Sequence, residues 1–299
     1  MDVLVTGAAG GLGRRLVEHL LAEGHGVTAS DLTLRPDMPV QLDITDLTDR
    51  IAVSRLLSPG FDAVIHAGNH PNFFSARPAE RLLAENMAMN ANVFWSALAV
   101  GVKRIIFISS IQAMLEADVT RWRAWDRPRA GEDSPAGIPC LPLTGSAPGI
   151  LGNNSYGMSK VFGEQTLQGL ARHDPELRAA SLRLAHVMRP SQRERYTRKG
   201  GHRQGFRREA GTYVDADDAA RACRLAIEHV KPGAQTYLMA RSPQITGMSD
   251  EQIREAYFDD VPLRGPIGGP GGLVDLIQEK ADLGWEPTDD RLEMPPPAG

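Results

Sequence analysis

The chain has 299 residues, of which 42% are hydrophobic and 23% are charged. These proportions are typical of a folded globular protein and exclude a chain that is disordered as a whole. Lysine and arginine number 33 against 37 aspartate and glutamate residues, a formal net charge of −4, so we expect no broad positive field and no nucleic-acid partner.

The first part of the sequence alternates short β-branched runs with helical patterns, which is typical of βαβ units. The predicted strands are residues 3–5, 26–30, 40–42, 63–66, 104–108 and 179–184, and the predicted helices are 10–23, 47–57, 78–100 and 156–172. An α/β fold with a Rossmann-like, doubly wound parallel sheet is the expected scaffold.

The second part contains two segments without regular periodicity. Residues 116–153 predict a long loop over one face, either functional or a surface insertion without a role. Residues 189–208 are rich in arginine and form either an anion clamp or a solvated face. The remaining predicted elements are a strand and helix at 212–229, a strand at 235–239, a helix at 249–258, a turn at 262–272 and a frayed tail at 294–299.

A glycine-rich stretch, Thr6–Gly13, lies between the first predicted strand and the first predicted helix. In this context glycines permit a tight turn, a close approach of the backbone to a pyrophosphate, and packing of the helix on the strand. The positive end of the helix then faces the phosphates. A turn that binds nothing is the alternative. The predicted cofactor contacts in this stretch are Gly7, Gly10, Gly11, Leu12 and Gly13.

Asp31 closes the second predicted strand, 18 positions after Gly13. A carboxylate there accepts hydrogen bonds from an adenosine ribose and repels the 2′-phosphate of NADP, and the next arginine is Arg35. NAD is therefore the predicted cofactor, with an ordinary turn residue as the alternative. We also predict that Asp43 and Ile44 contact the adenine.

Tyr156 and Lys160 are four residues apart at the start of a predicted helix, so they share one face. An ammonium group beside a phenol lowers its pKa from about 10 and makes it a usable acid and base. Ser109 and Ser110 end a buried strand, where side chains of an open α/β sheet line the ligand crevice. Together with the glycine-rich stretch, these residues predict a catalytic site.

The combination resembles the extended short-chain dehydrogenase/reductase family, in particular its NAD-dependent epimerase/dehydratase branch. Residues 86–93 are similar to the family's N-V-x-G-T-x-N-V helix, with Met89 and Asn90 in place of Gly-Thr. Residues 182–190 resemble L-R-x-x-x-V-x-G-P, and residues 213–220 resemble Y-V-x-V-x-D-V-A. The likeness covers nearly the whole chain.

The resemblance implies a role for each matched residue. Ser110 would hydrogen-bond the reacting oxygen, Tyr156 would remove or return its proton, and Lys160 would also bind the nicotinamide ribose. Ser109 is the alternative to Ser110. Further implied cofactor contacts are Ala67, Gly68 and Asn86, and implied substrate contacts are Asn69, Ser110, Gln112 and His186, the last with a buried structural histidine as the alternative.

The resemblance also implies two regions. Residues 1–184 would be mainly an NAD-binding Rossmann domain with the catalytic residues. Residues 185–299 would be mainly a small C-terminal substrate-binding lobe, with some segments returning to the first domain. A homodimer through two helices of each subunit is implied as well.

The reaction is narrowed by one departure from the family. Its dehydratases carry Asp-Glu directly after the catalytic hydroxyl residue, whereas this sequence has Ile111 and Gln112, which cannot act as the acid or base of an elimination. We expect an NAD-dependent dehydrogenase that transfers hydride at a secondary alcohol of a small, sugar-like substrate such as a sugar, uronate or sugar nucleotide. A sugar-nucleotide epimerase and a non-catalytic nucleotide-binding sensor are the alternatives.

The expected cellular location rests on the membrane-spanning and signal-peptide features that the sequence lacks. No apolar stretch approaches the roughly 20 residues that cross a bilayer, and the first strand begins too early for a signal peptide. Cys140 and Cys223 are far apart, so we expect neither a disulfide nor a metal site. The expected location is cytoplasmic, with no membrane contact.

Overall fold

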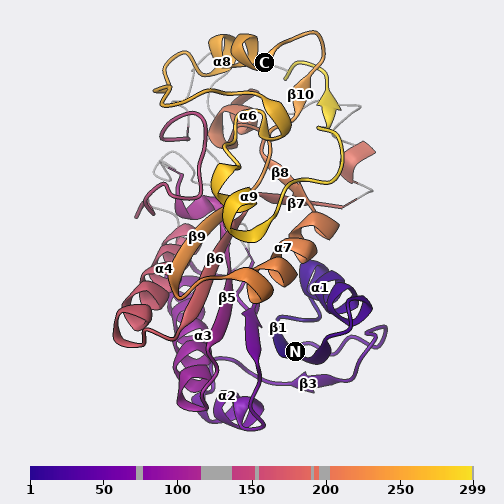
Figure 1. Ribbon diagram of the computed structural model, residues 1–299, viewed down its shortest axis with the longest axis vertical. Coiled ribbons are helices and arrows are strands. Elements are labelled where there is room, and N and C mark those ends of the chain that lie inside the picture. Colours follow the sequence, from indigo (N-terminus) through magenta and orange to yellow (C-terminus); the bar gives the residue numbers. More distant parts are fainter. Residues whose placement is uncertain (72–76, 116–136, 152–154, 190–191, 195–202, 298–299) are drawn as a thin grey trace.

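The computed structural model describes residues 1–71, 77–115, 137–151, 155–189, 192–194 and 203–297. A parallel sheet with helices on both faces forms the larger part, and C-terminal segments form a lobe above it (Figure 1).

Seven parallel strands form the central sheet in the order β3-β2-β1-β4-β5-β6-β9. They are β1 (Asp2–Thr6), β2 (Gly26–Asp31), β3 (Leu42–Ile44), β4 (Ala63–His66), β5 (Arg104–Ser110), β6 (Arg178–Leu184) and β9 (Gly233–Met239). The strand order reverses between β1 and β4, and open α/β sheets bind ligands at such a switch point, beyond the carboxyl ends of the strands. The predicted fold class is confirmed, although β3 begins at Leu42 and not at Val40.

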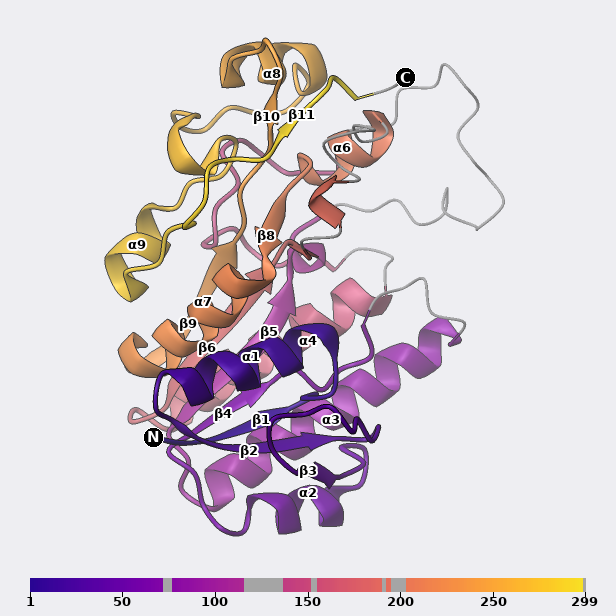
Figure 2. The ribbon, with the colours of Figure 1, turned by 90° about the vertical axis from the view of Figure 1, so that its right-hand side faces the viewer.

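Two layers of helices cover the sheet, as Figure 2 shows. One layer contains α1 (Gly11–Ala22) and α7 (Ala216–His229), and the other contains α2 (Arg50–Leu57), α3 (Ala79–Ala99) and α4 (Ser155–His173). Alternate strand residues point to opposite faces: Ile106 packs in the core with α1 and α7, whereas Ile105 and Phe107 pack in the core with α3. Burial on both faces explains the continuous apolar run of β5.

The lobe is built from short elements. Strands β7 (His186–Met188) and β8 (Tyr213–Asp215) pair in parallel, as do β10 (Gln244–Ile245) and β11 (Glu293–Met294). The helical elements around them are α6 (Arg203–Glu209), α8 (Asp250–Tyr257), η3 (Gly269–Gly271) and α9 (Ile277–Leu283), and η1 (Ile111–Ala113) follows β5. The prediction of a frayed tail from residue 294 is wrong for Met294, because it pairs with Ile245 and is buried.

Part of the predicted loop at 116–153 belongs to the lobe. Residues 116–136 and 152–154 lie outside the described residues. The backbone N–H of Leu141 donates to the carbonyl of Pro262, and that of Leu143 donates to Leu273, both at 2.9 Å. Residues 137–145 are therefore not a surface loop, because buried apolar side chains and backbone hydrogen bonds join them to the lobe.

Two arginines of the arginine-rich segment 189–208 bond carboxylates within the lobe. Arg207 is buried and donates to the Asp260 carboxylate at 2.7 Å, and Arg193 donates to Asp289 at 2.9 Å. Residues 190–191 and 195–202 lie outside the described residues. These two arginines thus bond carboxylates of the lobe itself and do not form an anion clamp.

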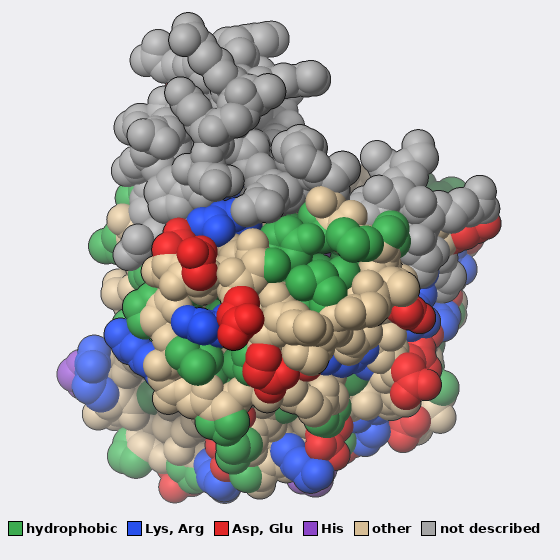
Figure 3. Space-filling model, turned by 90° about the horizontal axis from the view of Figure 1, so that it is seen from above, with side chains coloured by type: hydrophobic (Ala, Val, Ile, Leu, Met, Phe, Trp, Pro, Cys, Tyr) green, Lys and Arg blue, Asp and Glu red, His purple; other side chains and the backbone are tan. Residues whose placement is uncertain are grey.

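The described surface carries charged and apolar side chains side by side. On the face in Figure 3, acidic and basic side chains are interspersed around an apolar area. Among the described residues, no helix has the length and hydrophobicity needed to cross a membrane, and no three His, Cys, Asp or Glu side chains form a group suited to a metal ion. Cys140 and Cys223 are buried and unpaired.

Candidate active site

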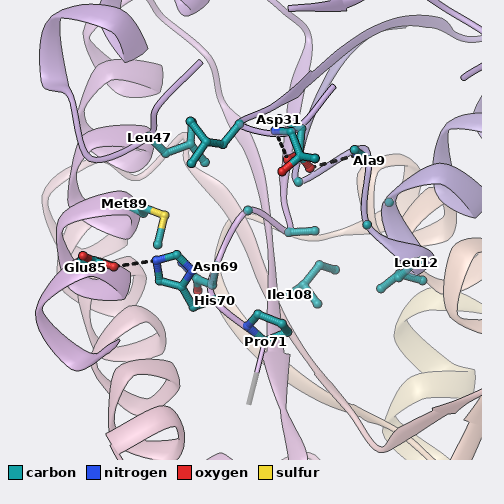
Figure 4. Close-up of a pocket in the computed structure, with 18 of the residues that line it drawn as sticks. Ala9, Leu12, Asp31, Leu47, Asn69, His70, Pro71, Glu85, Met89 and Ile108 are labelled. Carbon is teal, nitrogen blue, oxygen red and sulfur yellow. Dashed lines mark hydrogen bonds and ion pairs between the residues drawn. The ribbon is translucent and has the colours of Figure 1, made fainter. Parts of the chain in front are cut away.

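A cavity of about 960 Å³ lies at the carboxyl ends of the central strands (Figure 4). It is lined by the glycine-rich loop after β1, by the segments after β2, β3 and β4, and by residues of β5 and α4. The predicted site residues that line it are Gly7, Gly10, Gly11, Leu12, Gly13, Asp31, Ala67, Gly68, Asn69, Ser110, Tyr156 and Lys160. One cavity therefore joins the predicted cofactor and catalytic residues.

The glycine-rich loop leaves no room for side chains at two positions. Gly7 has a φ of +70°, and a Cβ atom there would lie 2.5 Å from the carbonyl oxygen of Ala67. A Cβ atom at Gly13 would lie 2.1 Å from the carbonyl oxygen of Gly7. These close approaches bring the start of α1 against the loop, as a dinucleotide fold requires.

The start of α1 fits an anionic group. A Cβ atom at Gly11 would meet nothing within 4 Å, although Gly11 lines the cavity. Among the described residues no side chain caps this helix at Gly10. The backbone N–H groups of the first turn are thus left for a ligand, and the helix dipole favours a negative one.

Asp31 and Arg35 flank the same loop. One Asp31 carboxylate oxygen accepts the N–H of Ala9 at 3.0 Å, and the other accepts the N–H of Thr33 at 2.9 Å. Figure 4 shows the carboxylate directed toward Ala9. The Arg35 guanidinium donates to the Ala9 carbonyl at 2.8 Å, so a carboxylate and a cation both lie at the predicted ribose end of the cavity.

Three predicted cofactor contacts do not line the cavity. Asp43 and Ile44 lie within β3, and the next residues, 45–48, line the cavity in their place. Asn86 is fully buried, and its side-chain oxygen accepts the backbone N–H of His70 at 2.8 Å. Asn92 is the residue of this helix that supports the 45–48 segment, through bonds to the carbonyls of Leu47 and Thr48 at 2.9 and 3.0 Å.

The two serines at the end of β5 have different partners. The Ser109 hydroxyl donates to the Glu164 carboxylate at 2.6 Å, and Glu164 pairs with Arg183 in a buried, bidentate ion pair at 2.9 and 2.7 Å. Ser110 instead hydrogen-bonds Tyr156. Of the two residues left open by the sequence, Ser110 is the one the structure places beside Tyr156.

Lys160 is buried, with its Nζ 2.8 Å from both the Asn69 side-chain oxygen and the Ile108 carbonyl oxygen. It lies 5.4 Å from the centre of the Tyr156 ring and 4.8 Å from that of Phe107. Burial lowers the pKa of Lys160 to about 7, against the raising effect of a nearby carboxylate.

The expectation of a lowered pKa for Tyr156 is wrong for this structure. Burial raises the pKa of Tyr156, and the bond with Ser110 opposes that effect only in part. The sequence shows the spacing of the pair but not its desolvation, which disfavours the charged form of both groups.

The predicted substrate residues divide into two groups. Asn69 and Ser110 line the cavity, whereas Gln112 and His186 do not. Gln112 donates to the Glu209 carboxylate at 3.0 Å. His186 is exposed on β7, so the alternative of a buried structural histidine is wrong.

An ion-paired group on the cavity wall is not among the predicted site residues. The Glu85 carboxylate, on α3, bonds His70 at 2.7 Å (Figure 4) and also pairs with Arg77 and Arg81. All four residues line the cavity. Only the spacing of Arg81 and Glu85 on one helix was a local signal for this group.

A model of the NAD dependent epimerase/dehydratase family matches residues 3–203. The chain belongs to this family. The resemblance found in the sequence is thereby confirmed, and NAD is the cofactor for which the glycine-rich loop and the start of α1 are suited.

The curated relatives of this epimerase/dehydratase family member match over parts of their length. Uronate dehydrogenase of Pseudomonas syringae pv. tomato is 38% identical over 111 residues, which cover 36% of this chain and 39% of that protein. L-arabinose 1-dehydrogenase (NAD(P)(+)) of Haloferax volcanii is 33% identical over 165 residues, covering 54% and 58%. In both cases less than two thirds of the relative is matched.

Solved structures share the fold over the whole chain. The crystal structure of UDP-glucose 4-epimerase from Bifidobacterium longum in complex with NAD+ and UDP has a TM-score of 0.66 at 20% identity. The match covers 97% of this chain and 94% of that protein. At this identity the comparison establishes a common fold.

Proposed function

We propose that this protein is an NAD-dependent oxidoreductase that transfers hydride at a secondary alcohol carbon of a sugar, uronate or sugar nucleotide, and that it acts as a dehydrogenase. The observation that carries the proposal is the grouping of Ser110, Tyr156 and Lys160 in the cavity that also contains the glycine-rich loop. The names of the two dehydrogenase relatives support a sugar or uronate substrate.

Each residue of the group has a chemical role in this proposal. The Ser110 hydroxyl holds the oxygen of the substrate alcohol, and Tyr156 accepts the hydroxyl proton as the carbon loses hydride. Bound NAD supplies the hydride acceptor. In this proposal the Lys160 ammonium, with its Nζ 5.4 Å from the centre of the Tyr156 ring, attracts the Tyr156 phenolate. The glycine-rich loop and the start of α1 would hold the pyrophosphate, and Asp31 the adenosine ribose.

The test is the appearance of NADH when purified protein and NAD are mixed with hexoses, hexuronates or sugar nucleotides. The matched variants are Tyr156→Phe and Tyr237→Phe. Tyr237 lies on the edge strand β9 and contacts Asp282, away from the cavity lining. We expect NADH with wild type and Tyr237→Phe, and loss of turnover with NAD binding retained in Tyr156→Phe.

Two results would contradict the proposal. Full turnover in Tyr156→Phe would remove the assigned proton acceptor. Isomerised sugar without NADH accumulation would replace the dehydrogenase by an epimerase, in which oxidation and re-reduction leave no net redox change.

We further propose that the regions divide the work as the family resemblance implies. Residues 1–184 would bind mainly NAD and residues 185–299 mainly the substrate. The return of α7 and β9 to the Rossmann layers, where β9 pairs with β6, supports the qualification that the second region is shared. A cytoplasmic location is also proposed, supported by two unpaired, buried cysteines, and cell fractionation tests it.

We propose a homodimer in which α3 contributes to the contact. Met87 and Trp95 are eight positions apart on this helix and are 41% and 53% exposed, although both are large and apolar. Such side chains on one helical face favour burial against a second copy. Light scattering should give a dimer for wild type and a monomer for Trp95→Glu, and a monomeric wild type would refute the assignment.

A further inference from the structure

A chain of buried polar side chains connects β1 with Lys160. The Thr6 hydroxyl is 2.7 Å from His66 Nδ1, and His66 Nε2 is 3.0 Å from the Asn90 side-chain oxygen. The Asn69 side-chain N–H₂ donates to the same Asn90 oxygen at 2.9 Å, and the Asn69 oxygen accepts from Lys160 Nζ at 2.8 Å. Thr6 and His66 lie on β1 and β4, Asn69 follows β4, and Asn90 and Lys160 lie on α3 and α4, so several elements of the fold fix their geometry together.

The hydrogen bonds allow one orientation of each amide. A lysine ammonium group can only donate, so the Asn69 oxygen must face Lys160 and the Asn69 nitrogen must face Asn90. The Asn90 nitrogen then faces the Ser159 carbonyl at 3.4 Å. Burial, with the nearby Lys160 charge, lowers the pKa of His66 to about 3, so this imidazole stays neutral and donates from Nε2.

Lys160 depends on direct acceptors because it is 3% exposed. A buried ammonium loses its hydration and is stable only where hydrogen-bond acceptors or counter-charges replace the water. The titratable groups around it are Tyr156 and Glu164 on its own helix and His66 on β4. Glu164 is paired with Arg183, and among the described residues Lys160 Nζ donates to the Asn69 side-chain oxygen and to the Ile108 carbonyl oxygen.

We propose that Asn69 is a positioning residue that holds the Lys160 ammonium and sets the pH range over which it is charged. The proposal rests on the proposed function for the role of Lys160, and it gives Asn69 a task other than the substrate contact implied by the family resemblance. Asn90 accepts a hydrogen bond from Asn69 and so orients it. The family helix motif has threonine at this position, so the bond between the two asparagine side chains is a feature of this chain and not of the motif.

The arrangement also has a consequence for ligand binding. An ammonium group has three N–H bonds. Asn69 and Ile108 accept two of them on the wall of the cavity. The third N–H bond can point into the cavity, where Tyr156 lies and where a ribose hydroxyl would bind. Loss of Asn69 would therefore free the lysine side chain to rotate as well as lowering its charge at neutral pH.

The experiment follows the titration of Lys160 directly. The sequence has five lysines, so isotope-labelled lysine side chains give few NMR signals, and the Lys160 signal is assigned by its loss in Lys160→Met. The titration midpoint is compared between wild type, Asn69→Asp and Asn69→Leu. Asn92→Leu is the matched control, because it removes an amide of α3 that bonds backbone carbonyls elsewhere.

We expect Asn69→Asp to raise the midpoint by about one to three pH units, because a carboxylate then faces the ammonium. Asn69→Leu should lower the midpoint, and Asn92→Leu should leave it unchanged. Should Asn69→Leu fail to fold, the isosteric Asn69→Asp still decides the question. Midpoints equal to wild type in the Asn69 variants would overturn the proposal.

This titration uses the protein without substrate, so its outcome is separate from the proposed dehydrogenase activity. A shifted midpoint in a protein that oxidises no sugar would retain Asn69 as the positioning residue and reject the proposed reaction. NADH formation by wild type together with unshifted midpoints would support the proposed reaction and reject Asn69 as the positioning residue. The pH dependence of NAD binding, measured by calorimetry, should move with the midpoint in the same variants.

Discussion

Glu279 provides a sharp test of how the lobe is attached to the sheet. This α9 side chain is fully buried, and one carboxylate oxygen accepts the N–H of Leu238 on β9 at 2.8 Å. The other oxygen has no hydrogen-bond partner among the described residues. Burial raises the pKa of Glu279 to about 7, and the carboxylates of Asp275 and Asp282 add to the effect.

The sign and size of the effect follow from linkage. In the folded state Glu279 keeps its proton up to about pH 7, whereas in the unfolded state it releases the proton near its ordinary pKa of about 4.5. The stability that protonated Glu279 contributes is therefore fully present below about pH 4.5 and is lost as the pH rises to about 7. A difference of roughly 2.5 pKa units corresponds to about 3 kcal/mol in the free energy of unfolding. Above about pH 7 the full cost of the buried charge is present.

The assay is urea unfolding of wild type and Glu279→Gln at about pH 5 and about pH 8. The variant keeps an oxygen for Leu238 and cannot ionise, so we expect its stability to fall by roughly 2 to 3 kcal/mol less than that of wild type between the two conditions. The exposed Glu251→Gln variant on α8 is the control. An equal pH dependence in wild type and Glu279→Gln would refute the reasoning.

Three further predictions concern the cavity and its support. Asp31→Ala leaves Arg35 at the ribose end, so kcat/KM for NADP relative to NAD should rise by about tenfold or more; an unchanged ratio would reduce Asp31 to a residue that holds the loop. Ser110→Ala should lower kcat by roughly 10²- to 10³-fold. Ser109→Ala should mainly lower the free energy of unfolding, by about 1–3 kcal/mol, because it breaks the hydrogen bond to Glu164. Measurements of turnover and of urea unfolding on both variants separate the two roles. Arg183→Leu should destabilise the protein by about 3–5 kcal/mol by leaving the Glu164 charge buried, and adding Glu164→Leu should restore much of the loss; a loss below about 1 kcal/mol in the single variant would show that the pair is not energetically coupled.

The features that could be predicted from the sequence depend on local signals. The run of β5 and the glycine-rich stretch carry their structural requirements in adjacent residues, and the Tyr156–Lys160 spacing places both side chains on one helical face. The contact between Asn69 and Lys160 joins residues 91 positions apart. No periodicity or motif encodes such a contact.

Errors at the sequence level arose where burial or tertiary pairing decides the outcome. The tail prediction fails at Met294 because short parallel pairs such as β10 and β11 have no sequence pattern of their own. The spacing of Tyr156 and Lys160 indicates nearby charge but not the desolvation of both groups, which raises the pKa of Tyr156 and lowers that of Lys160. The carboxylate partners of Arg193 and Arg207 are distant in sequence, so no local pattern indicates these ion pairs.

The position of β9 at the end of the sheet has a consequence for synthesis of the chain. Its partner β6 ends at Leu184, yet β9 begins at Gly233, beyond the last residue of the family match. A nascent chain that has emerged only to α6 therefore presents β6 as an unpaired edge, a template for association with other chains. Premature termination in this interval, or slow translation through it, should yield aggregates, and completion of β9 covers the edge of β6.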